Sequence, residues 1–150
     1  MGPDRRASTR TVVPVAGALL KIRFFDRQDA SNPLNGETFD RPEPLLDVLK
    51  RFANRKPFFC ELVGQNGFNL LVGVGTLGCA QYSPGDGSLP YLMAVAPDTS
   101  PRQEVVEFFT GGTPSPVPGR YALPFSLVAE IVVCFQETGG LSKSVSWEEI

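Results

Sequence analysis

Three closely spaced turn signals divide the middle of this chain into short apolar runs, and this spacing limits the folds it can form. Asn66-Gly67 supplies the positive φ that a tight hairpin needs. Gly73 to Gly78 forms a glycine-rich corner, and Pro84 to Gly87 forms a further turn. Strands joined by turns this short lie antiparallel. The chain is therefore expected to contain an antiparallel meander.

The apolar pattern places strands and helices around these turns. The expected strands are residues 17–25, 58–63, 68–74, 79–83, 89–95 and 104–109. Residues 43–54 have the apolar period of a helix, and a second helix is opened by Pro124 and stopped by Gly139. Residues 26–42 and 111–119 are rich in turn-forming residues and are expected to be loops. The predicted fold class is α+β, an antiparallel β-meander sheet with two helices packed on one face.

The length of 150 residues suits one domain with its own core, because 42% of the residues are apolar and 20% are charged. Residues 1–16 are expected to form a flexible N-terminal segment, and residues 17–150 a single domain. The arginine-rich start resembles a short signal peptide, but Pro14 and Gly17 interrupt its apolar run, so a disordered start is favoured. No apolar run has the length of a membrane span.

The sequence contains no His, which excludes Ser–His and Cys–His pairs and the commonest protein metal ligand. Cys60, Cys79 and Cys134 lie far apart and form no CxxC motif, which is typical of reduced core cysteines in a cytoplasmic protein. Apolar neighbours would raise the pKa of Cys60. We therefore expect no catalytic residue, no metal site and no cofactor.

Two motifs have a functional and a structural interpretation. Gly73, Gly75 and Gly78 match the GxGxxG pattern, but the residues that follow do not begin a long helix, so a hairpin corner is favoured over a dinucleotide site. Glu104 and Glu107 point to opposite faces of a strand, so solvated charge is favoured over a catalytic pair.

Charge is divided unevenly along the chain. Residues 1–56 carry eleven Lys and Arg against seven Asp and Glu, whereas residues 57–150 carry three against nine. This division either serves solubility or provides an acidic face for a basic partner, and it disfavours direct binding of nucleic acid. Trp147, the only Trp, is expected to dock the tail against the core. Tyr and acidic side chains provide the candidate partner contacts: Tyr82, Asp86, Tyr91, Glu104, Glu107, Glu148 and Glu149.

Several short motifs occur in a characteristic order between Pro44 and Ile150. They are Leu-Leu-Asp-Val-Leu from Leu45, Asn-Leu-Leu-Val-Gly-Val from Asn69, Gln-Tyr-Ser from Gln81, Pro-Tyr-Leu from Pro90, Glu-Phe-Phe-Thr-Gly-Gly-Thr from Glu107, the segment from Leu123 to Gly139, and Val-Ser-Trp-Glu-Glu from Val145. With these motifs the chain resembles the family-one immunity proteins of bacterial polymorphic toxin systems. Residues before about position 42 look unlike the shorter members.

The resemblance implies a cytoplasmic protein that binds a cognate toxin domain, a nucleic-acid deaminase, and blocks its active site. It implies no cofactor and no direct contact with nucleic acid or membrane. Two other interpretations stay open. One is a structural or interaction module of another assembly, and the other is a small-ligand-binding protein or enzyme that uses Cys60 or the Gly73–Gly78 loop.

Overall fold

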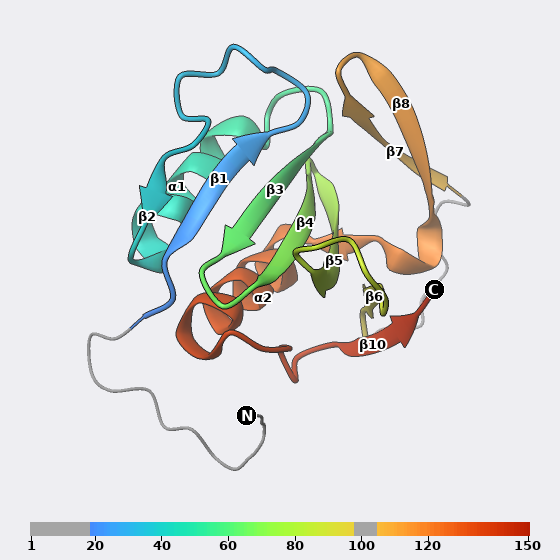
Figure 1. Cartoon of the computed structure of the whole chain (residues 1–150). Helices are drawn as coiled ribbons and strands as arrows, with labels where there is room; N and C mark the ends of the chain where they lie inside the picture. The colour runs from blue at the N-terminus through green and yellow to red at the C-terminus, as the bar shows by residue number, and fades with distance from the viewer. Residues whose placement is uncertain (1–18, 98–104) are drawn as a thin grey trace.

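An antiparallel sheet with the strand order β10-β6-β5-β4-β3-β1-β2 forms the centre of the computed structural model, which describes residues 19–97 and 105–150 (Figure 1). The predicted α+β class is confirmed. The predicted N-terminal segment 1–16 lies outside the described residues. The strands are β1 (Ile22–Asp26), β2 (Thr38–Phe39), β3 (Phe58–Gly64), β4 (Phe68–Val74), β5 (Leu77–Pro84), β6 (Leu92–Val95), β7 (Val105–Thr110), β8 (Thr113–Pro118), β9 (Leu123–Pro124) and β10 (Ser146–Glu149).

Tight turns join the central strands as their sequences predict. The Asn66-Gly67 turn connects β3 to β4, and Gly67 has the positive φ of 88° that a residue with a Cβ rarely adopts. The Gly73–Gly78 segment connects β4 to β5, with Gly73 opposite Cys79 in the ladder. The GxGxxG motif is therefore a hairpin corner, as expected.

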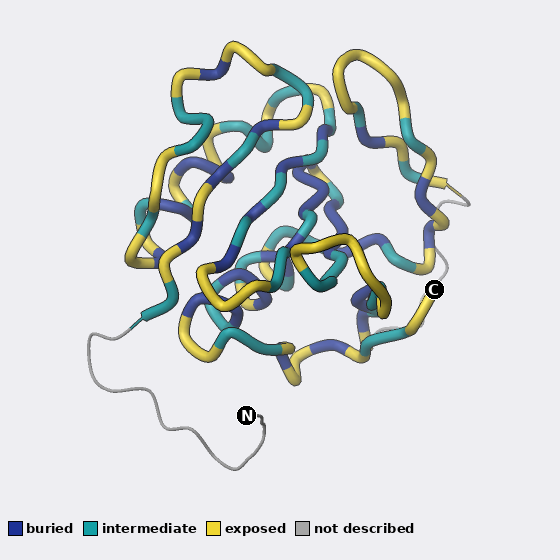
Figure 2. Tube along the Cα trace, in the orientation of Figure 1, coloured by how far each residue is buried: buried dark blue, intermediate teal, exposed yellow. Residues whose placement is uncertain are grey.

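Two helices, α1 (Pro42–Phe52) and α2 (Phe125–Thr138), pack on one face of the sheet, which we call the inner face (Figure 1). Helix α2 ends where Gly139 adopts the left-handed conformation and donates its N–H to the Phe135 carbonyl at 2.7 Å. Alternate residues of β3 are buried beneath the helices (Figure 2). The largest fully buried side chains of this core are Phe24, Phe58, Phe135, Ile22, Leu45, Leu49, Leu62, Leu70, Leu123 and Ile131.

The prediction that residues 111–119 form a loop is wrong, because this segment contains strand β8. Strand β8 pairs only with β7, so one of its edges has no partner among the described residues. Its prolines, Pro114, Pro116 and Pro118, occupy every second position. Pro has no N–H to donate, but an edge strand needs N–H donors only at alternate positions. The period of two therefore makes a proline-rich segment compatible with a strand.

Three further expectations need correction at their boundaries. The strand predicted from residue 17 begins at Ile22, and the one predicted from residue 89 begins at Leu92, after Pro90. The predicted loop 26–42 contains the two-residue strand β2, which extends the sheet beyond β1. The tail forms β10 and pairs with β6, so the sheet ends in a strand from the last residues of the chain.

The hairpin corner leads to a testable prediction for Gly78. A Cβ at this position would lie 2.5 Å from the Gly73 carbonyl oxygen and 2.9 Å from Val128 Cγ2. Because the first obstacle is backbone in a paired strand, we expect Gly78→Ala to lower the free energy of unfolding by roughly 1–3 kcal/mol. Urea denaturation measures this. Gly140→Ala is the matched control, since its Cβ would meet Thr138 Oγ1 at an ordinary 3.5 Å. Equal stability of the two variants would contradict the prediction.

Candidate functional site

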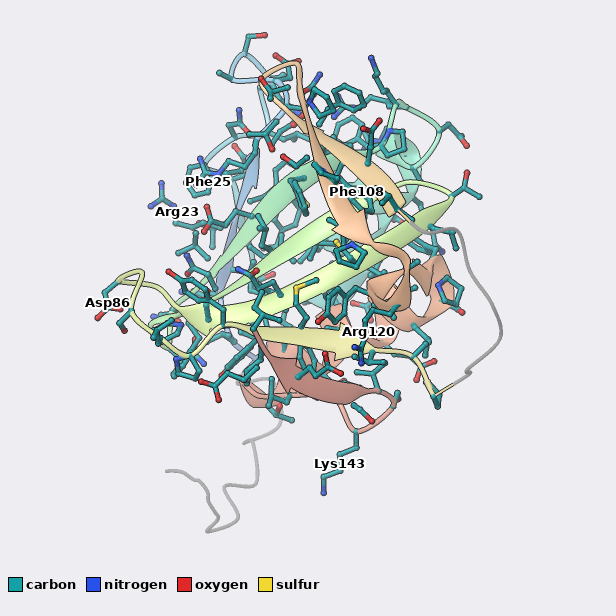
Figure 3. The ribbon with its side chains drawn as sticks, turned by 90° about the vertical axis from the view of Figure 1, so that its right-hand side faces the viewer. Arg23, Phe25, Asp86, Phe108, Arg120 and Lys143 are labelled. Atoms are coloured by element: carbon teal, nitrogen blue, oxygen red, sulfur yellow. The ribbon has the colours of Figure 1, made fainter. Side chains whose placement is uncertain are left out.

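The face of the sheet opposite the helices, which we call the outer face, is covered over only part of its area. The β7–β8 hairpin lies across it and inserts Phe108, whose ring centroid is 5.1 Å from that of Phe59. Phe108 belongs to a second apolar cluster with Cys79, Met93 and Val117. Figure 3 shows Phe108 beneath this hairpin, while Arg23, Phe25 and Asp86 lie at the other end of the sheet.

Beside the hairpin, the outer face contains a hollow of about 750 Å³, which we call the sheet-face hollow. Its lining comes from Arg27 just after β1, from β3 and β4 with the turn between them, and from the end of β5 with the loop that follows. The lining residues are Arg27, Glu61, Val63, Gly64, Gly67, Asn69, Pro84, Gly85 and Asp86.

Glu61 connects the polar side chains of the hollow. Its Oε1 accepts hydrogen bonds from Arg27 Nε, at 3.0 Å, and from Arg27 Nη2. Its Oε2 accepts a hydrogen bond from Asn69 Nδ2 at 2.8 Å. This contact turns the amide oxygen of Asn69 away from Glu61, and a Cβ at Gly85 would lie 3.1 Å from that oxygen. Asn69 Oδ1 is buried and accepts no hydrogen bond from the described residues.

An aromatic ring between two arginines borders the hollow on β1. Arg23 and Phe25 lie on β1, and Arg27 directly follows the strand with its N–H bonded to the Phe59 carbonyl. The three are spaced two residues apart, so their side chains share the outer face. The guanidinium carbons of Arg23 and Arg27 each lie 5.1 Å from the Phe25 ring centroid, within the range of cation–π attraction. Figure 3 shows Arg23 and Phe25 toward the same end of the molecule as Asp86. These contacts hold Phe25 in place on a rigid strand.

Asp86 lies in the loop that forms the opposite wall. Its Oδ1 accepts hydrogen bonds from Ser88 Oγ at 2.6 Å and from Ser88 N at 2.9 Å. The side-chain bond from Ser88, followed by its backbone bond, lowers the pKa of the Asp86 carboxyl below its ordinary value. Asp86 is therefore an exposed, ionised carboxylate at neutral pH.

Tyr82 and Tyr91, two predicted contacts, lie on either side of this loop. Tyr82 faces the inner side, stacks on Phe68 with centroids 5.0 Å apart, and donates its hydroxyl to the Gly139 carbonyl at 3.0 Å. Burial raises the Tyr82 pKa to about 12. Tyr91 donates its hydroxyl to the Gly87 carbonyl at 2.6 Å and so braces the loop that carries Asp86.

The predicted acidic contacts are spread over several elements. Glu107 is exposed on β7. Glu148, on β10, accepts hydrogen bonds from Arg120 and, at 2.8 Å, from the Tyr121 hydroxyl. Glu149 is exposed at the end of the same strand, and Glu104 lies outside the described residues. Of the six predicted contacts that the structure describes, Asp86 alone lines the sheet-face hollow.

The tail itself docks as predicted. Trp147 packs its ring 6.3 Å from that of Tyr82, next to the inner core, and donates its indole N–H to the Ser142 carbonyl at 2.9 Å. The expectation that Trp147 joins the tail to the core is confirmed.

The contacts predicted from the sequence do not include four residues at the hollow: Phe25, Arg27, Glu61 and Asn69. Glu61 is the only charged residue in an otherwise apolar strand, and Asn69 is the only polar side chain in β4. A single polar side chain in an otherwise apolar strand indicates a position on the sheet that no other element covers. The sequence does not reveal that these positions meet Arg27, because their contact depends on strand register.

The buried thiols lie away from the hollow and are poor nucleophiles. Desolvation raises the Cys60 pKa far above its ordinary value and that of Cys79 to about 12. Both thiols stay protonated at neutral pH, and a protonated thiol is unreactive. Among the described residues, no three Cys, Asp or Glu side chains gather as a metal site would require, and no helix combines the length and hydropathy needed to cross a membrane.

The hollow combines charge from both halves of the sequence. Arg27 belongs to the basic half, whereas Glu61 and Asp86 belong to the acidic half. Glu61 is ion-paired with Arg27, and Arg23 lies beside the same Phe25 ring, so the charges around the hollow are mixed.

No family model matches this chain, and none of the curated proteins or solved structures does. The resemblance to immunity proteins therefore stays a prediction from the sequence.

Proposed function

We propose that this protein is a cytoplasmic immunity protein that binds a cognate toxin domain and blocks its active site, the toxin being a nucleic-acid deaminase. The observation that carries the proposal is the open part of the outer face. There a charged hollow and an aromatic ring held between two arginines lie on paired strands.

The composition of this face suits contact with another protein. Arg and aromatic residues are the side chains that most often dominate binding energy at protein interfaces. Phe25 is held between Arg23 and Arg27, and Arg27 is held by Glu61, so little side-chain freedom remains to be lost on binding. The strands that carry these side chains belong to the central sheet, which limits backbone movement on association.

The charge of the hollow suits a blocking role. A domain that acts on nucleic acid presents positive charge to the phosphate backbone. Asp86 offers an exposed negative charge that such a surface would attract, and complementary charge speeds association. A stable inhibitory interface buries about 1,600 Å² in total, so contacts beyond the hollow must take part. Such a complex would exclude substrate without any chemistry by the inhibitor.

Co-expression tests the proposal directly. The probe is the C-terminal domain of the toxin encoded by the neighbouring gene, and the readouts are growth of the host and affinity by calorimetry. We expect the chain to protect growth. We expect Phe25→Ala to weaken binding at least tenfold, which corresponds to about 1.4 kcal/mol.

Val105→Ala is the matched control, because Val105 is an exposed apolar side chain on β7, outside the hollow. This variant should bind as the parent chain does. Absence of both binding and protection would overturn the proposal. Binding without protection would also overturn it and would favour an interaction module of another assembly.

A further inference from the structure

We propose that the three prolines of β8 close the free edge of the β7–β8 hairpin to strand pairing, so that a second copy of this chain cannot pair with it there. The prolines are Pro114, Pro116 and Pro118, the alternate residues of the strand. The inference is independent of the proposed function, because it concerns backbone hydrogen bonds between copies of this chain alone.

The direction of the backbone groups in β7 follows from a hydrogen bond on its other side. Phe109 donates its N–H to the Pro57 carbonyl at 2.9 Å, so this N–H points away from β8. Backbone groups alternate in direction along a strand, so those of Glu107 also point away from β8. Those of Val106 and Phe108, which lie in between, point toward β8 and form the hydrogen bonds of the ladder.

The register of the ladder transfers this direction to β8. Pro114 lies opposite Phe109, and Pro116 lies opposite Glu107. Both prolines therefore occupy pairs without mutual hydrogen bonds, and Pro118 follows the same alternation. Their nitrogens and carbonyls face the free edge of β8, which has no strand partner among the described residues (Figure 1).

The free edge of β8 therefore offers hydrogen-bond acceptors without donors. A proline nitrogen has no hydrogen, so each of the three outward positions supplies a carbonyl only. An added strand would direct its own carbonyls at these positions and would meet proline rings instead of N–H groups. Because a polar group that is buried without a hydrogen bond opposes association, such an edge cannot complete a ladder.

A second free edge, that of β10, keeps its donors. Ile150 donates its N–H to the Tyr91 carbonyl at 3.0 Å, so every second residue counted back from Ile150 points toward β6. The outward residues of β10 are then Trp147 and Glu149, and both have an N–H group. The longer of the two edges, six residues against four, is thus the one in which prolines replace the outward donors.

The composition of β7 shows why a closed edge matters at this place. Its sequence, Val-Val-Glu-Phe-Phe-Thr, consists mainly of β-branched and aromatic residues and contains one charge. Short segments of this composition pair readily with copies of themselves. Strand β8 covers one edge of β7, and its prolines prevent the addition of a further strand.

The test restores the outward donors in the full chain. Pro114→Thr and Pro116→Thr are combined, because both prolines are exposed and Thr favours strands. Sedimentation velocity over a range of protein concentrations measures self-association. We expect the double variant to form dimers with a dissociation constant about tenfold or more below that of the parent chain.

The matched control combines Pro114→Lys with Pro116→Lys. It removes the same two rings and restores the same two N–H groups, so both double variants should lose similar stability through the unfolded chain. When two antiparallel copies pair through β8, lysines lie opposite lysines and repel each other. We therefore expect the Lys variant to associate no more than the parent chain does. Urea denaturation verifies that both variants are folded.

Amide hydrogen exchange locates the contact between the copies. The restored amides at positions 114 and 116 should gain protection as the concentration of the Thr variant rises. If this double variant does not fold, Pro116→Thr and Pro116→Lys repeat the comparison with one restored donor. The proposal is wrong if the Thr variant stays as monomeric as the parent chain, if the Thr and Lys variants associate equally, or if association brings no protection at the restored amides.

Discussion

Replacing Asp26 with Ala is expected to lower the free energy of unfolding by roughly 3 kcal/mol, because it leaves a buried cluster of donors without their acceptor. The Asp26 side chain is fully buried and its Oδ2 lies 3.0 Å from Arg55 Nη2 and 2.9 Å from Asn32 Nδ2. Its Oδ1 accepts the backbone N–H groups of Gln28 and Asp29 at 2.9 and 3.1 Å. Urea denaturation of the purified variant measures the loss.

Asp29→Asn is the matched control for the first prediction. Asp29 belongs to the same loop and accepts two hydrogen bonds from Ser31, but it is exposed, so its substitution should not shift the urea midpoint measurably. Asp26→Asn separates charge from shape, since its amide would direct a donor toward Arg55 or Asn32. We expect it to lose most of the stability that Asp26→Ala loses. A midpoint unchanged in both Asp26 variants would refute the account.

The hydrogen-bonded cluster of Asp26 with Arg55, Asn32 and the backbone of Gln28 and Asp29 also affects the candidate site. Asp26 is the last residue of β1, between Phe25 and Arg27, and its bonds hold the start of the loop that follows the strand. Arg27 supplies one charged wall of the sheet-face hollow. Loss of the cluster should therefore loosen Arg27 at the hollow, in addition to lowering stability.

Phe108→Ala is expected to lower the free energy of unfolding by roughly 3–5 kcal/mol, the range for removing a buried aromatic side chain. Phe108 is fully buried, packs on Phe59 and lies against Gly73, where an added Cβ would come within 2.6 Å of its ring. This close approach lets one side chain anchor the β7–β8 hairpin on the outer face. Urea denaturation measures the global loss, and amide hydrogen exchange should show protection of the hairpin falling most.

Phe109→Ala provides the control, because it changes the neighbouring residue of the same strand. Phe109 is half-buried, with the Lys56 ammonium 4.0 Å from its ring centroid, and it points away from Phe108. Its removal should lower the free energy of unfolding by about 1 kcal/mol, mostly because buried apolar area and a cation–π contact are lost. If both variants lost equal stability, Phe108 would not be the anchor of the hairpin.

Local signals were sufficient for the central strands and the two helices. Tight-turn residues such as Asn66-Gly67 specify their conformation through a few neighbouring atoms, so their effect is readable in the sequence. The helical period from Leu45 and the stop at Gly139 act over similarly short distances. Strand β8 was missed because a proline-rich segment becomes a strand only when a neighbour supplies the ladder, as β7 does here.

The candidate site depended on contacts that no local pattern contains. Arg27 meets Glu61 across 34 positions of the chain, and Asn69 meets the same carboxylate from the next strand. Among the predicted contacts, Tyr82 faces the inner core and Asp86 the hollow, although they lie four residues apart. Which face a side chain occupies follows from strand register and from the element that covers each face.

By itself, the sequence determined the kinds and order of the central elements and the docking of Trp147, since turn chemistry and apolar period act between near neighbours. Tertiary structure alone decided that the β7–β8 hairpin covers part of the outer face and leaves a charged hollow beside it. The physical reason is that hydrophobic burial is not directional. Apolar side chains require a covering layer, but only the packed arrangement of all strands selects which part of a sheet stays open.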